Sequence, residues 1–468
     1  MIFYPPELVP MQGRFVFSEN VTAKASHCLS KAIFSELWHN FSFRASSLTV
    51  EPCNEFVFSI GAVDRLPLDG AEYSINVSEN GIYVYAESER SLLHGFMTLL
   101  DRIRATEDDS GIKAQIDACQ IKDRAAIQTR MVHFCIFPET EPWELQRFIR
   151  FCGALKYTHV VLEFWGMLRY DCMKELAWSH AFTKEELRPI LREASDLGLE
   201  IIPMFNHWGH ASGGRVMHGK HVVLDQNPAL QTYFSDDGWC WNLQNPKVRN
   251  LLKCVREELI DLCGDGEYFH IGCDEAYNFD LSTSEGMDAI CDFMNEVAKD
   301  LCSVGRRLIV WGDMFLFRHP SYNPKNRYTC NAPRADCEQY MLTRLSKDIM
   351  IADWQYDAPE APVETASVFH HAGFDCMLCP WDRGIKELNA VLETVKSESL
   401  TGVLMTTWHT LTKGMPLVTM AAVGAYNKVS TDLRYYRTET AALLRKVFPA
   451  NGNYERAGWA KYQIGIIT

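Results

Sequence analysis

An adjacent pair of carboxylic acids, Asp274 and Glu275, is the part of the sequence best suited to chemistry. The pair closes the segment FHIGCDE, in which an apolar, strand-like run reaches Gly272. Consecutive residues of a regular strand point to opposite faces, so both acids can address one ligand only if the strand ends before them. The alternative is that they are acids at the start of a helix, where the helix dipole favours negative charge. Because a strand ends at this point, we predict that the pair acts on a substrate.

Aromatic and polar side chains recur where the other predicted strands end. They are His207, Trp208, His210, Trp311, Asp313, Trp354, Tyr356, Trp381, Asp382, Trp408 and His409. Core strands favour Val, Ile and Leu, so tryptophan at five strand ends is typical of a ligand surface rather than of core packing. An apolar pocket with a few fixed acids suits a sugar.

Eight short apolar runs, separated by amphipathic helical stretches, position these residues. The runs are 131–135, 159–164, 200–205, 268–272, 308–311, 349–354, 375–379 and 402–408. This alternation is typical of βαβ units, and eight units over about 300 residues predict an α/β fold of the (β/α)₈ TIM barrel type. A doubly wound open sheet is the alternative. In a barrel, the C-terminal ends of the strands meet at one face, which would bring the residues named above together.

The chain divides into three predicted parts. Residues 1–125 mix strand-like runs at 56–61 and 81–88 with a helical stretch, which predicts a small α/β N-terminal domain. The catalytic barrel is expected over 126–430 and a C-terminal helical tail over 431–468.

Composition excludes several classes of protein. The 468-residue chain has 46 Lys plus Arg against 60 Asp plus Glu, a formal net charge of −14, so it does not collect nucleic acid or anionic membrane by bulk attraction. No apolar run approaches the roughly 20 residues of a membrane-spanning helix. The start, MIFYPPELVP, lacks the pattern of a secretory signal. We therefore expect a cytoplasmic protein with no nucleic-acid or membrane partner, and make no prediction of its oligomeric state.

Several segments resemble glycoside hydrolase family 20, the exo-acting β-N-acetylhexosaminidases, and in particular the hexosaminidase D-like branch. The stretch HIGCDE is similar to the family's His-x-Gly-x-Asp-Glu signature. GIYVYAESERSLLHGFMTLL resembles the end of the family's small N-terminal domain, and AFTKEELRPILREASDLGLEIIPMFNHWGHA resembles its third barrel unit. The resemblance implies a TIM barrel that removes terminal β-linked GlcNAc or GalNAc from a small glycan or glycoconjugate.

The resemblance also implies a retaining, substrate-assisted mechanism through an oxazolinium intermediate. Asp274 would hold the acetamido N–H and stabilise the positive charge, and Glu275 would act first as acid and then as base. The negative charge of Asp274 would raise the pKa of Glu275 and so favour its protonated form. No cofactor and no metal are expected.

Substrate-binding roles follow from the resemblance for further residues. Arg130 would grip sugar hydroxyls through its forked donors, the alternative being a salt bridge within the barrel. His210 would hydrogen-bond to the acids. The aromatic walls around the terminal sugar would be Trp311, Trp354 and Trp408.

The chain also departs from the family pattern. Cys273 replaces a usual glycine, and 408–410 reads Trp-His-Thr where a glutamate commonly contacts the distal hydroxyls. The family's tyrosine on the seventh strand is absent in plain form. Tyr356, from the sixth strand, is expected to supply the hydroxyl to the acetamido oxygen, with Trp381 and Asp382 closing the pocket.

Two other functions stay open. His207 with His210, and the neighbours His370 and His371, permit a metal-dependent TIM-barrel hydrolase, although the His-x-His motif of such enzymes is missing. A non-catalytic carbohydrate-binding barrel is the second, since a fold does not guarantee a function. The presence of both acids argues against it.

Overall fold

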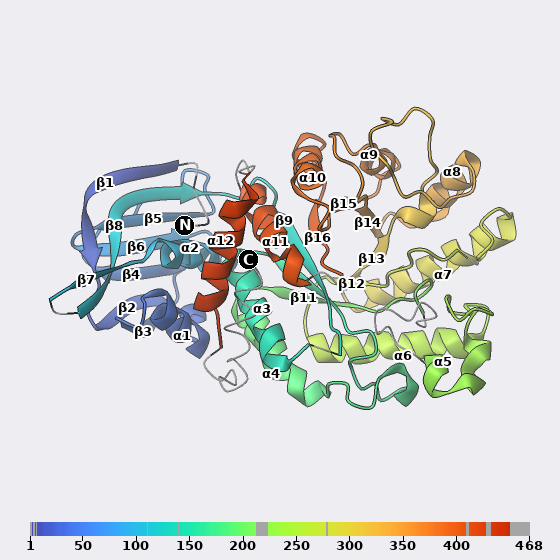
Figure 1. The fold of residues 1–468 in the computed structure, drawn as a ribbon, viewed down its shortest axis with the longest axis horizontal. Helices are drawn as coiled ribbons and strands as arrows, with labels where there is room; N and C mark the ends of the chain where they lie inside the picture. Colours follow the sequence, from blue (N-terminus) through green and yellow to red (C-terminus); the bar gives the residue numbers. More distant parts are fainter. Residues whose placement is uncertain are drawn as a thin grey trace.

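The protein is described by a computed structural model for residues 2, 5, 7–109, 111–138, 140–211, 223–277, 279–408, 411–426 and 432–449, apart from the side chains of 108 and 411–413. An N-terminal sheet with helices lies beside a closed barrel of eight parallel strands (Figure 1). The predicted TIM barrel with a preceding α/β domain is confirmed, and the open-sheet alternative is wrong. His409, Thr410 and most of the predicted C-terminal tail lie outside the described residues.

The N-terminal sheet is mostly antiparallel, in the order β1-β8-β5-β6-β4-β2-β3, with β7 paired to β8. Its strands are β1 (Glu7–Val16), β2 (Asn20–Ser26), β3 (Ser47–Cys53), β4 (Val57–Gly61), β5 (Tyr73–Ser78), β6 (Gly81–Ala86), β7 (Arg104–Asp108) and β8 (Gly111–Asp123). Its helices are α1 (Ala32–Phe41) and α2 (Glu89–Arg102). Residues 91–101 of α2 are all buried, because this helix contacts both the sheet and a barrel helix. One continuous apolar core therefore spans both parts of the molecule.

The barrel closes because its last strand pairs with its first. The strands are β9 (Thr129–Cys135), β10 (His159–Glu163), β11 (Glu200–Met204), β12 (Tyr268–His270), β13 (Arg307–Trp311), β14 (Met350–Trp354), β15 (Cys376–Cys379) and β16 (Gly402–Met405). Nearly every strand residue is buried, as expected for a parallel sheet covered on its outer face by helices. Inward-pointing side chains form a separate interior cluster that includes Met131, Ile202 and Trp311.

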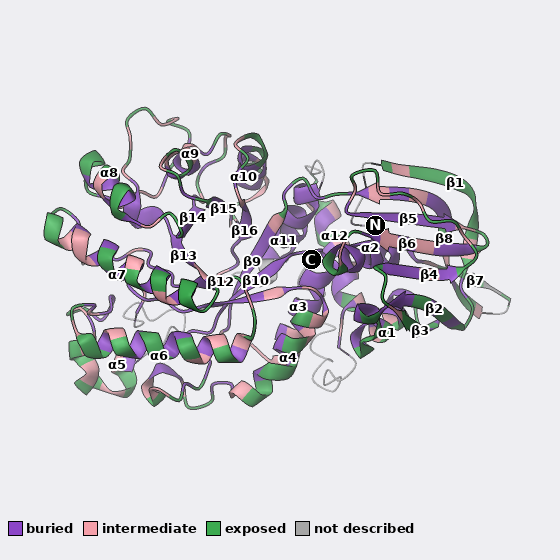
Figure 2. Cartoon of the chain, turned by 180° about the vertical axis from the view of Figure 1, so that it is seen from behind, coloured by how far each residue is buried: buried purple, intermediate pink, exposed green. Residues whose placement is uncertain are grey.

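The helices that follow β9 turn their buried faces inward and their exposed faces outward (Figure 2). They are α3 (Pro142–Ala154), α4 (Lys184–Asp196), α5 (Val223–Gln226), α6 (Pro246–Cys263), α7 (Ser284–Ser303), α8 (Ala335–Arg344), α9 (Glu364–His371), α10 (Ile385–Ser397), α11 (Leu411–Tyr426) and α12 (Leu433–Lys446). Helix α4 begins with a capping box. The side chain of Thr183 accepts a hydrogen bond from the backbone N–H of Glu186, and the side chain of Glu186 accepts one from the backbone N–H of Thr183. Within the described residues, no helix is long and apolar enough to cross a membrane.

A buried polar network joins the two parts where β9 and β10 begin. Lys156, between α3 and β10, is fully buried and donates to Tyr73 and Thr98 of the N-terminal domain, at 3.0 Å each. Its Nζ also lies 3.4 Å from Asp123. Burial lowers the pKa of Lys156 to about 8, although Asp123 opposes the shift. The N-terminal domain therefore packs at the end of the barrel opposite to the C-terminal ends of its strands.

Candidate active site

The two acids lie on one side of the chain because β12 ends early. The strand stops at His270, and the next residues take left-handed backbone conformations, with φ of +66° at Gly272, +79° at Cys273 and +50° at Glu275. Such values are uncommon for residues other than glycine, and they concentrate at functional sites. The turn brings both carboxylates within reach of one ring nitrogen: Nε2 of His210 lies 3.3 Å from Asp274 Oδ2 and 3.1 Å from Glu275 Oε2.

A second loop, after β11, is tightly packed against this turn. A Cβ on Gly209 would lie 2.0 Å from the backbone oxygen of Asp274, so only glycine allows the two chains to approach this closely. His210, at φ +57°, follows directly, and its ring packs 4.2 Å from that of Trp239. The indole N–H of Trp239 donates to the backbone oxygen of Glu275 at 2.7 Å. The position of His210 against both acids is therefore set by the backbone as well as by its own hydrogen bonds.

The surroundings of Glu275 lower the pKa of its carboxyl group, although the group lies beside the charge of Asp274. Burial raises the pKa of Glu275 and the charge of Asp274 raises it further, but hydrogen bonds from His210 and Tyr277 stabilise the carboxylate, and the net pKa lies below its ordinary value. The Tyr277 hydroxyl donates to Glu275 Oε1 at 2.5 Å. Asp274 thus raises the pKa of Glu275, as predicted, but in the protein without substrate the hydrogen bonds outweigh this effect and the protonated form is not favoured.

Asp313, expected from its strand-end position to lie at the ligand surface, is a third acid of the site. Its carboxylate accepts from the backbone N–H of Glu275 at 3.0 Å, from Asn331 at 2.8 Å and from the indole of Trp354 at 3.1 Å. Burial, together with the charge of Asp274, raises the pKa of Asp313 to about 7. The sequence feature that points to Asp313 is its position two residues after the end of β13, where the functional groups of a barrel gather. Asp313 thus joins the acid pair to the aromatic residues of the next strand.

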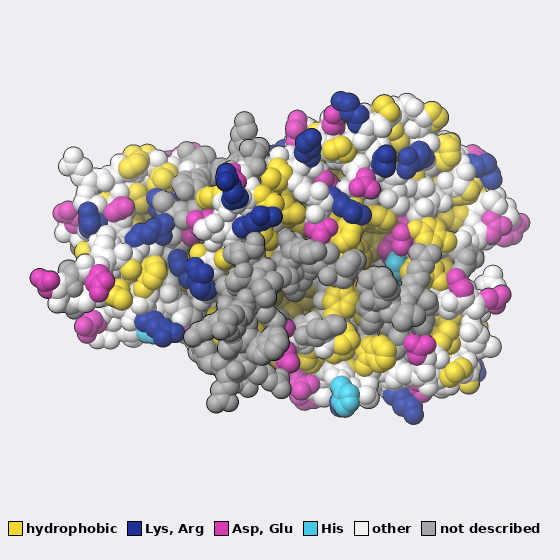
Figure 3. Space-filling model, in the orientation of Figure 1, with side chains coloured by type: hydrophobic (Ala, Val, Ile, Leu, Met, Phe, Trp, Pro, Cys, Tyr) yellow, Lys and Arg dark blue, Asp and Glu magenta, His cyan; other side chains and the backbone are white. Residues whose placement is uncertain are grey.

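Aromatic side chains from three neighbouring strand ends form a continuous wall. Tyr356 packs 5.0 Å from Trp354 and 5.2 Å from Trp381, as ring centroids. The indole N–H of Trp408 donates to the Tyr356 hydroxyl at 2.7 Å, and Thr406 lies 3.2 Å from the same hydroxyl. On the face seen in Figure 3, hydrophobic side chains gather over the barrel, on the right of the view.

Trp311 and Asp382 were both expected to line the pocket, and they differ in burial. Trp311 is fully buried in the barrel interior, between His270 and Trp408, with ring distances of 4.3 and 5.6 Å. It belongs to the same cluster of side chains as Trp354, Tyr356 and Trp408, and its contact with a sugar stays a prediction. Asp382 is half-buried beside Trp381. Burial raises the pKa of Glu387 well above its ordinary value, and the charge of Asp382 adds to this shift.

Arg130 lies at the wrong end of the barrel to bind a sugar. It is 1% exposed at the start of β9, and its guanidinium donates to the backbone oxygens of Lys156, Ile127 and Gln128 at 2.9 Å each. A further N–H lies 3.3 Å from the hydroxyl of Tyr426. The prediction that Arg130 grips sugar hydroxyls is therefore wrong. Its N–H groups bond to backbone oxygens and to a tyrosine hydroxyl at the domain junction, so the alternative of a salt bridge is wrong as well.

The histidines that suggested a metal-dependent hydrolase do not assemble. Nε2 of His207 lies 3.1 Å from a guanidinium nitrogen of Arg256, where a second cation would be repelled. Burial, with the charge of Arg256, lowers the pKa of His207. His370 and His371 lie in the last turn of α9, on the outside of the barrel. This set of histidines therefore does not form a shared site with His210.

Comparisons with known proteins agree with this geometry. Residues 157–383 match the model of glycosyl hydrolase family 20, catalytic domain. The chain is 21% identical over 323 residues to lacto-N-biosidase of Bifidobacterium bifidum, covering 65% of this chain and 26% of that protein. It is 22% identical over 302 residues to beta-hexosaminidase of Porphyromonas gingivalis, covering 56% and 38%. The chain thus spans well under half the length of these two relatives.

Solved structures share the fold over nearly the whole chain. An inactive variant of the GH20 exo beta-N-acetylglucosaminidase of Vibrio harveyi superposes with a TM-score of 0.68 at 17% identity, covering 95% of this chain and 76% of that one. The GH20 beta-N-acetylhexosaminidase of Streptomyces coelicolor gives a TM-score of 0.66 at 16% identity, covering 95% of each chain. At these identities, the likeness shows the fold.

Proposed function

We propose that this glycoside hydrolase, whose residues 157–383 match the family 20 catalytic domain, is a retaining exo-β-N-acetylhexosaminidase. Its substrate would be a small glycan or glycoconjugate that ends in β-linked GlcNAc or GalNAc. The observation that carries the proposal is the contact of two consecutive carboxylates with one imidazole nitrogen, at 3.1 and 3.3 Å, at the C-terminal face of a TIM barrel. Two acids so close together can serve two neighbouring atoms of one sugar.

Substrate-assisted catalysis suits this spacing. The 2-acetamido oxygen attacks the anomeric carbon of its own sugar, the bond to the leaving oxygen breaks, and an oxazolinium ion forms, so no protein nucleophile is needed. Asp274 accepts a hydrogen bond from the acetamido N–H and stabilises the positive charge of the oxazolinium ion. Glu275 gives its proton to the leaving oxygen, and then takes a proton from the water that opens the oxazolinium ring. His210, in contact with both, orients them.

Glu275 must be protonated when the substrate is bound, although its pKa is lowered without substrate. Without substrate, the hydroxyl of Tyr277 donates to Glu275 Oε1 and stabilises the ionised carboxylate. A leaving-group oxygen placed at Oε1 displaces this hydroxyl. A sugar that fills the site also removes water, and desolvation favours the neutral acid. Substrate binding thus shifts the pKa of Glu275 in the direction that catalysis requires.

Tyr356 is suited to hold the acetamido oxygen. Because the indole of Trp408 donates to its hydroxyl at 2.7 Å, the proton of Tyr356 can be donated to another acceptor. Burial raises the pKa of Tyr356 well above its ordinary value, so the phenol keeps that proton. Trp354 and Trp381 on either side offer flat apolar faces for the sugar ring and the acetamido methyl.

The expected cytoplasmic location is part of the proposal. All sixteen cysteines lie within the described residues and none forms a disulfide, as is usual in a reducing compartment. The excess of acidic residues disfavours nucleic acid as a partner. Membership in the hexosaminidase D-like branch is likewise proposed, on the residue pattern alone.

Hydrolysis of aryl glycosides tests the proposal. We expect cleavage of aryl β-GlcNAc or β-GalNAc, no comparable cleavage of the aryl glucoside without the acetamido group, and inhibition by a thiazoline mimic of the cyclic intermediate. Equal rates with and without the acetamido group would refute substrate assistance. Failure to cleave any of these, with tight binding of the thiazoline, would instead favour a non-catalytic carbohydrate-binding barrel.

The variant Glu275→Gln tests the assignment of the acid. It should slow cleavage of poor leaving groups far more than that of activated aryl groups, because only poor leaving groups need the proton. Glu285→Gln, at an exposed acid in the first turn of α7, is the matched control and should leave both rates unchanged. Equal losses for all leaving groups with Glu275→Gln would contradict its role as acid.

A further inference from the structure

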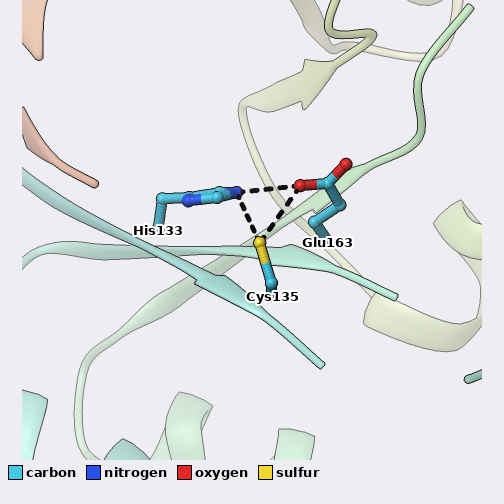
Figure 4. A group of neighbouring side chains, drawn as sticks. All are labelled: His133, Cys135 and Glu163. Carbon is cyan, nitrogen blue, oxygen red and sulfur yellow. Dashed lines mark hydrogen bonds and ion pairs between the residues drawn. The ribbon is translucent and has the colours of Figure 1, made fainter. Parts of the chain in front are cut away.

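A second group of reactive side chains, His133, Cys135 and Glu163, lies at the C-terminal ends of β9 and β10 (Figure 4). His133 and Cys135 are two residues apart on one strand and so point to the same side of it. Glu163 is the last residue of the neighbouring strand and is paired in register with Cys135. The proposed glycosidase mechanism uses none of the three.

The three side chains converge on one point. Nε2 of His133 lies 3.2 Å from Oε2 of Glu163, Sγ of Cys135 lies 3.3 Å from the same oxygen, and Sγ and Nε2 are 3.8 Å apart. All three residues are at most 6% exposed. The donor set therefore contains one imidazole nitrogen, one sulfur and one carboxylate oxygen around a small buried volume.

These separations are close to those of a zinc site. With Zn–N and Zn–O near 2.1 Å and Zn–S near 2.3 Å, tetrahedral ligands lie about 3.4 Å apart for nitrogen and oxygen, and about 3.6 Å apart for sulfur and either of them. The observed 3.2, 3.3 and 3.8 Å each differ from these values by no more than about 0.3 Å. An ion could enter with only small movements of the side chains.

Neighbouring residues hold the group in place. Asn206 donates to Oε1 of Glu163 at 2.5 Å, which leaves Oε2 directed at the other two residues. The Thr407 hydroxyl donates to the backbone oxygen of His133 at 2.7 Å, and the ring of Trp408 packs 4.6 Å from that of His133. Such outer contacts orient metal ligands in known sites. A cation at the centre would also compensate the charge of the buried Glu163 carboxylate.

We propose that His133, Cys135 and Glu163 form a binding site for Zn²⁺ or a similar borderline divalent cation. Nε2, Sγ and Oε2 would be the three protein ligands, which leaves a fourth tetrahedral position for water or another ligand. The thiol proton of Cys135 leaves to solvent when the Zn–S bond forms, so binding is tighter at higher pH. The alternative is a hydrogen-bonded triangle, in which thiol and imidazole both donate to Glu163.

The inference does not depend on the proposed glycosidase activity. His210, Asp274 and Glu275 also gather possible ligands, but they include no sulfur. The third such group within the described residues, His159 with Glu200 and Glu267, likewise has none. A signal from a metal–thiolate bond would therefore report the site at His133, Cys135 and Glu163.

Cobalt substitution of the full chain is the direct experiment. Co²⁺ alone is added to chelator-treated protein, and the near-ultraviolet thiolate-to-cobalt charge-transfer band is titrated, then reversed with Zn²⁺. We expect one Co²⁺ per chain, a band that Zn²⁺ removes, and a rise in thermal unfolding temperature with Zn²⁺. Wild-type protein with no such band at saturating Co²⁺ would overturn the proposal and favour the hydrogen-bonded triangle.

Variants locate the ligands. Cys135→Ser should abolish the band, whereas Cys379→Ser, at a buried cysteine of the barrel interior, is the matched control and should keep it. Asn206→Ala should weaken Zn²⁺ binding by roughly 10- to 100-fold, as loss of an outer contact does. A band that persists in Cys135→Ser would refute this set of ligands. Should Cys135→Ser fail to fold, His133→Gln tests the same ligand set through stoichiometry and affinity.

Discussion

Removal of the Tyr277 hydroxyl is expected to raise the pKa of Glu275. In Tyr277→Phe, the 2.5 Å hydrogen bond to the carboxylate is lost and the ring is kept. A hydrogen bond to a charged group contributes about 1.5–3 kcal/mol. Tyr277 is 48% exposed, so water replaces part of the interaction, and we take about 1.4 kcal/mol, or about one pKa unit.

The assay is the pH dependence of kcat/KM on an aryl GlcNAc with a poor leaving group, which reports the free enzyme. The proton donor must be protonated, so activity falls as the pH rises through the pKa of Glu275. Because Tyr277→Phe raises that pKa, the alkaline limb should move to higher pH by about one unit. Tyr340→Phe is the control, since Tyr340 donates to Asp288 at 2.7 Å between α8 and α7 and should leave the limb in place.

A limb that stays in place or moves to lower pH in Tyr277→Phe would refute the reasoning. An unmoved limb with normal folding would mean that Tyr277 does not stabilise the ionised Glu275, or that another group is the acid. Near-ultraviolet circular dichroism of both variants establishes that the fold is intact before the profiles are compared.

Three further substitutions separate catalysis from folding. Asp274→Asn should lower kcat for good and poor leaving groups alike, by about 2–4 kcal/mol in activation free energy, and a loss confined to poor leaving groups would contradict charge stabilisation. Tyr356→Phe should slow hydrolysis sharply in steady-state kinetics, and unaltered rates would remove its hydroxyl from the site. Arg130→Leu should lower the thermal unfolding temperature, because four hydrogen bonds at the domain junction are lost, while the folded protein keeps its KM. A raised KM with an unchanged unfolding temperature would show instead that Arg130 binds the sugar.

Local patterns in the sequence were enough to predict the elements of the barrel and the position of the acids. Each barrel strand is buried on both faces, so it reads as a short apolar run, and β12 was recognised in this way. The need for a strand end before Asp274 follows from side-chain alternation, and the left-handed backbone at Cys273 and Glu275 meets it. These features depend on neighbours in the chain.

The tertiary structure decided which way the long side chains point and which charges meet. Arg130 extends toward carbonyl groups at the start of β9 rather than toward the pocket, and its residue type does not reveal this direction. The pKa of Glu275 depends on competition between burial, Asp274, His210 and Tyr277, whose distances follow from the packing of separate loops.

The same distinction separates the sequence patterns from the site at His133, Cys135 and Glu163. Hydrophobic periodicity, turn residues and the adjacent acids are local properties, so the amino-acid sequence by itself determined the barrel and its acid pair. The convergence of side chains from β9 and β10, the role of Asp313 and the burial of Trp311 arose only from tertiary packing. The physical reason is that desolvation, hydrogen bonding and metal-ligand geometry act over a few ångströms in space, between residues that are far apart along the chain.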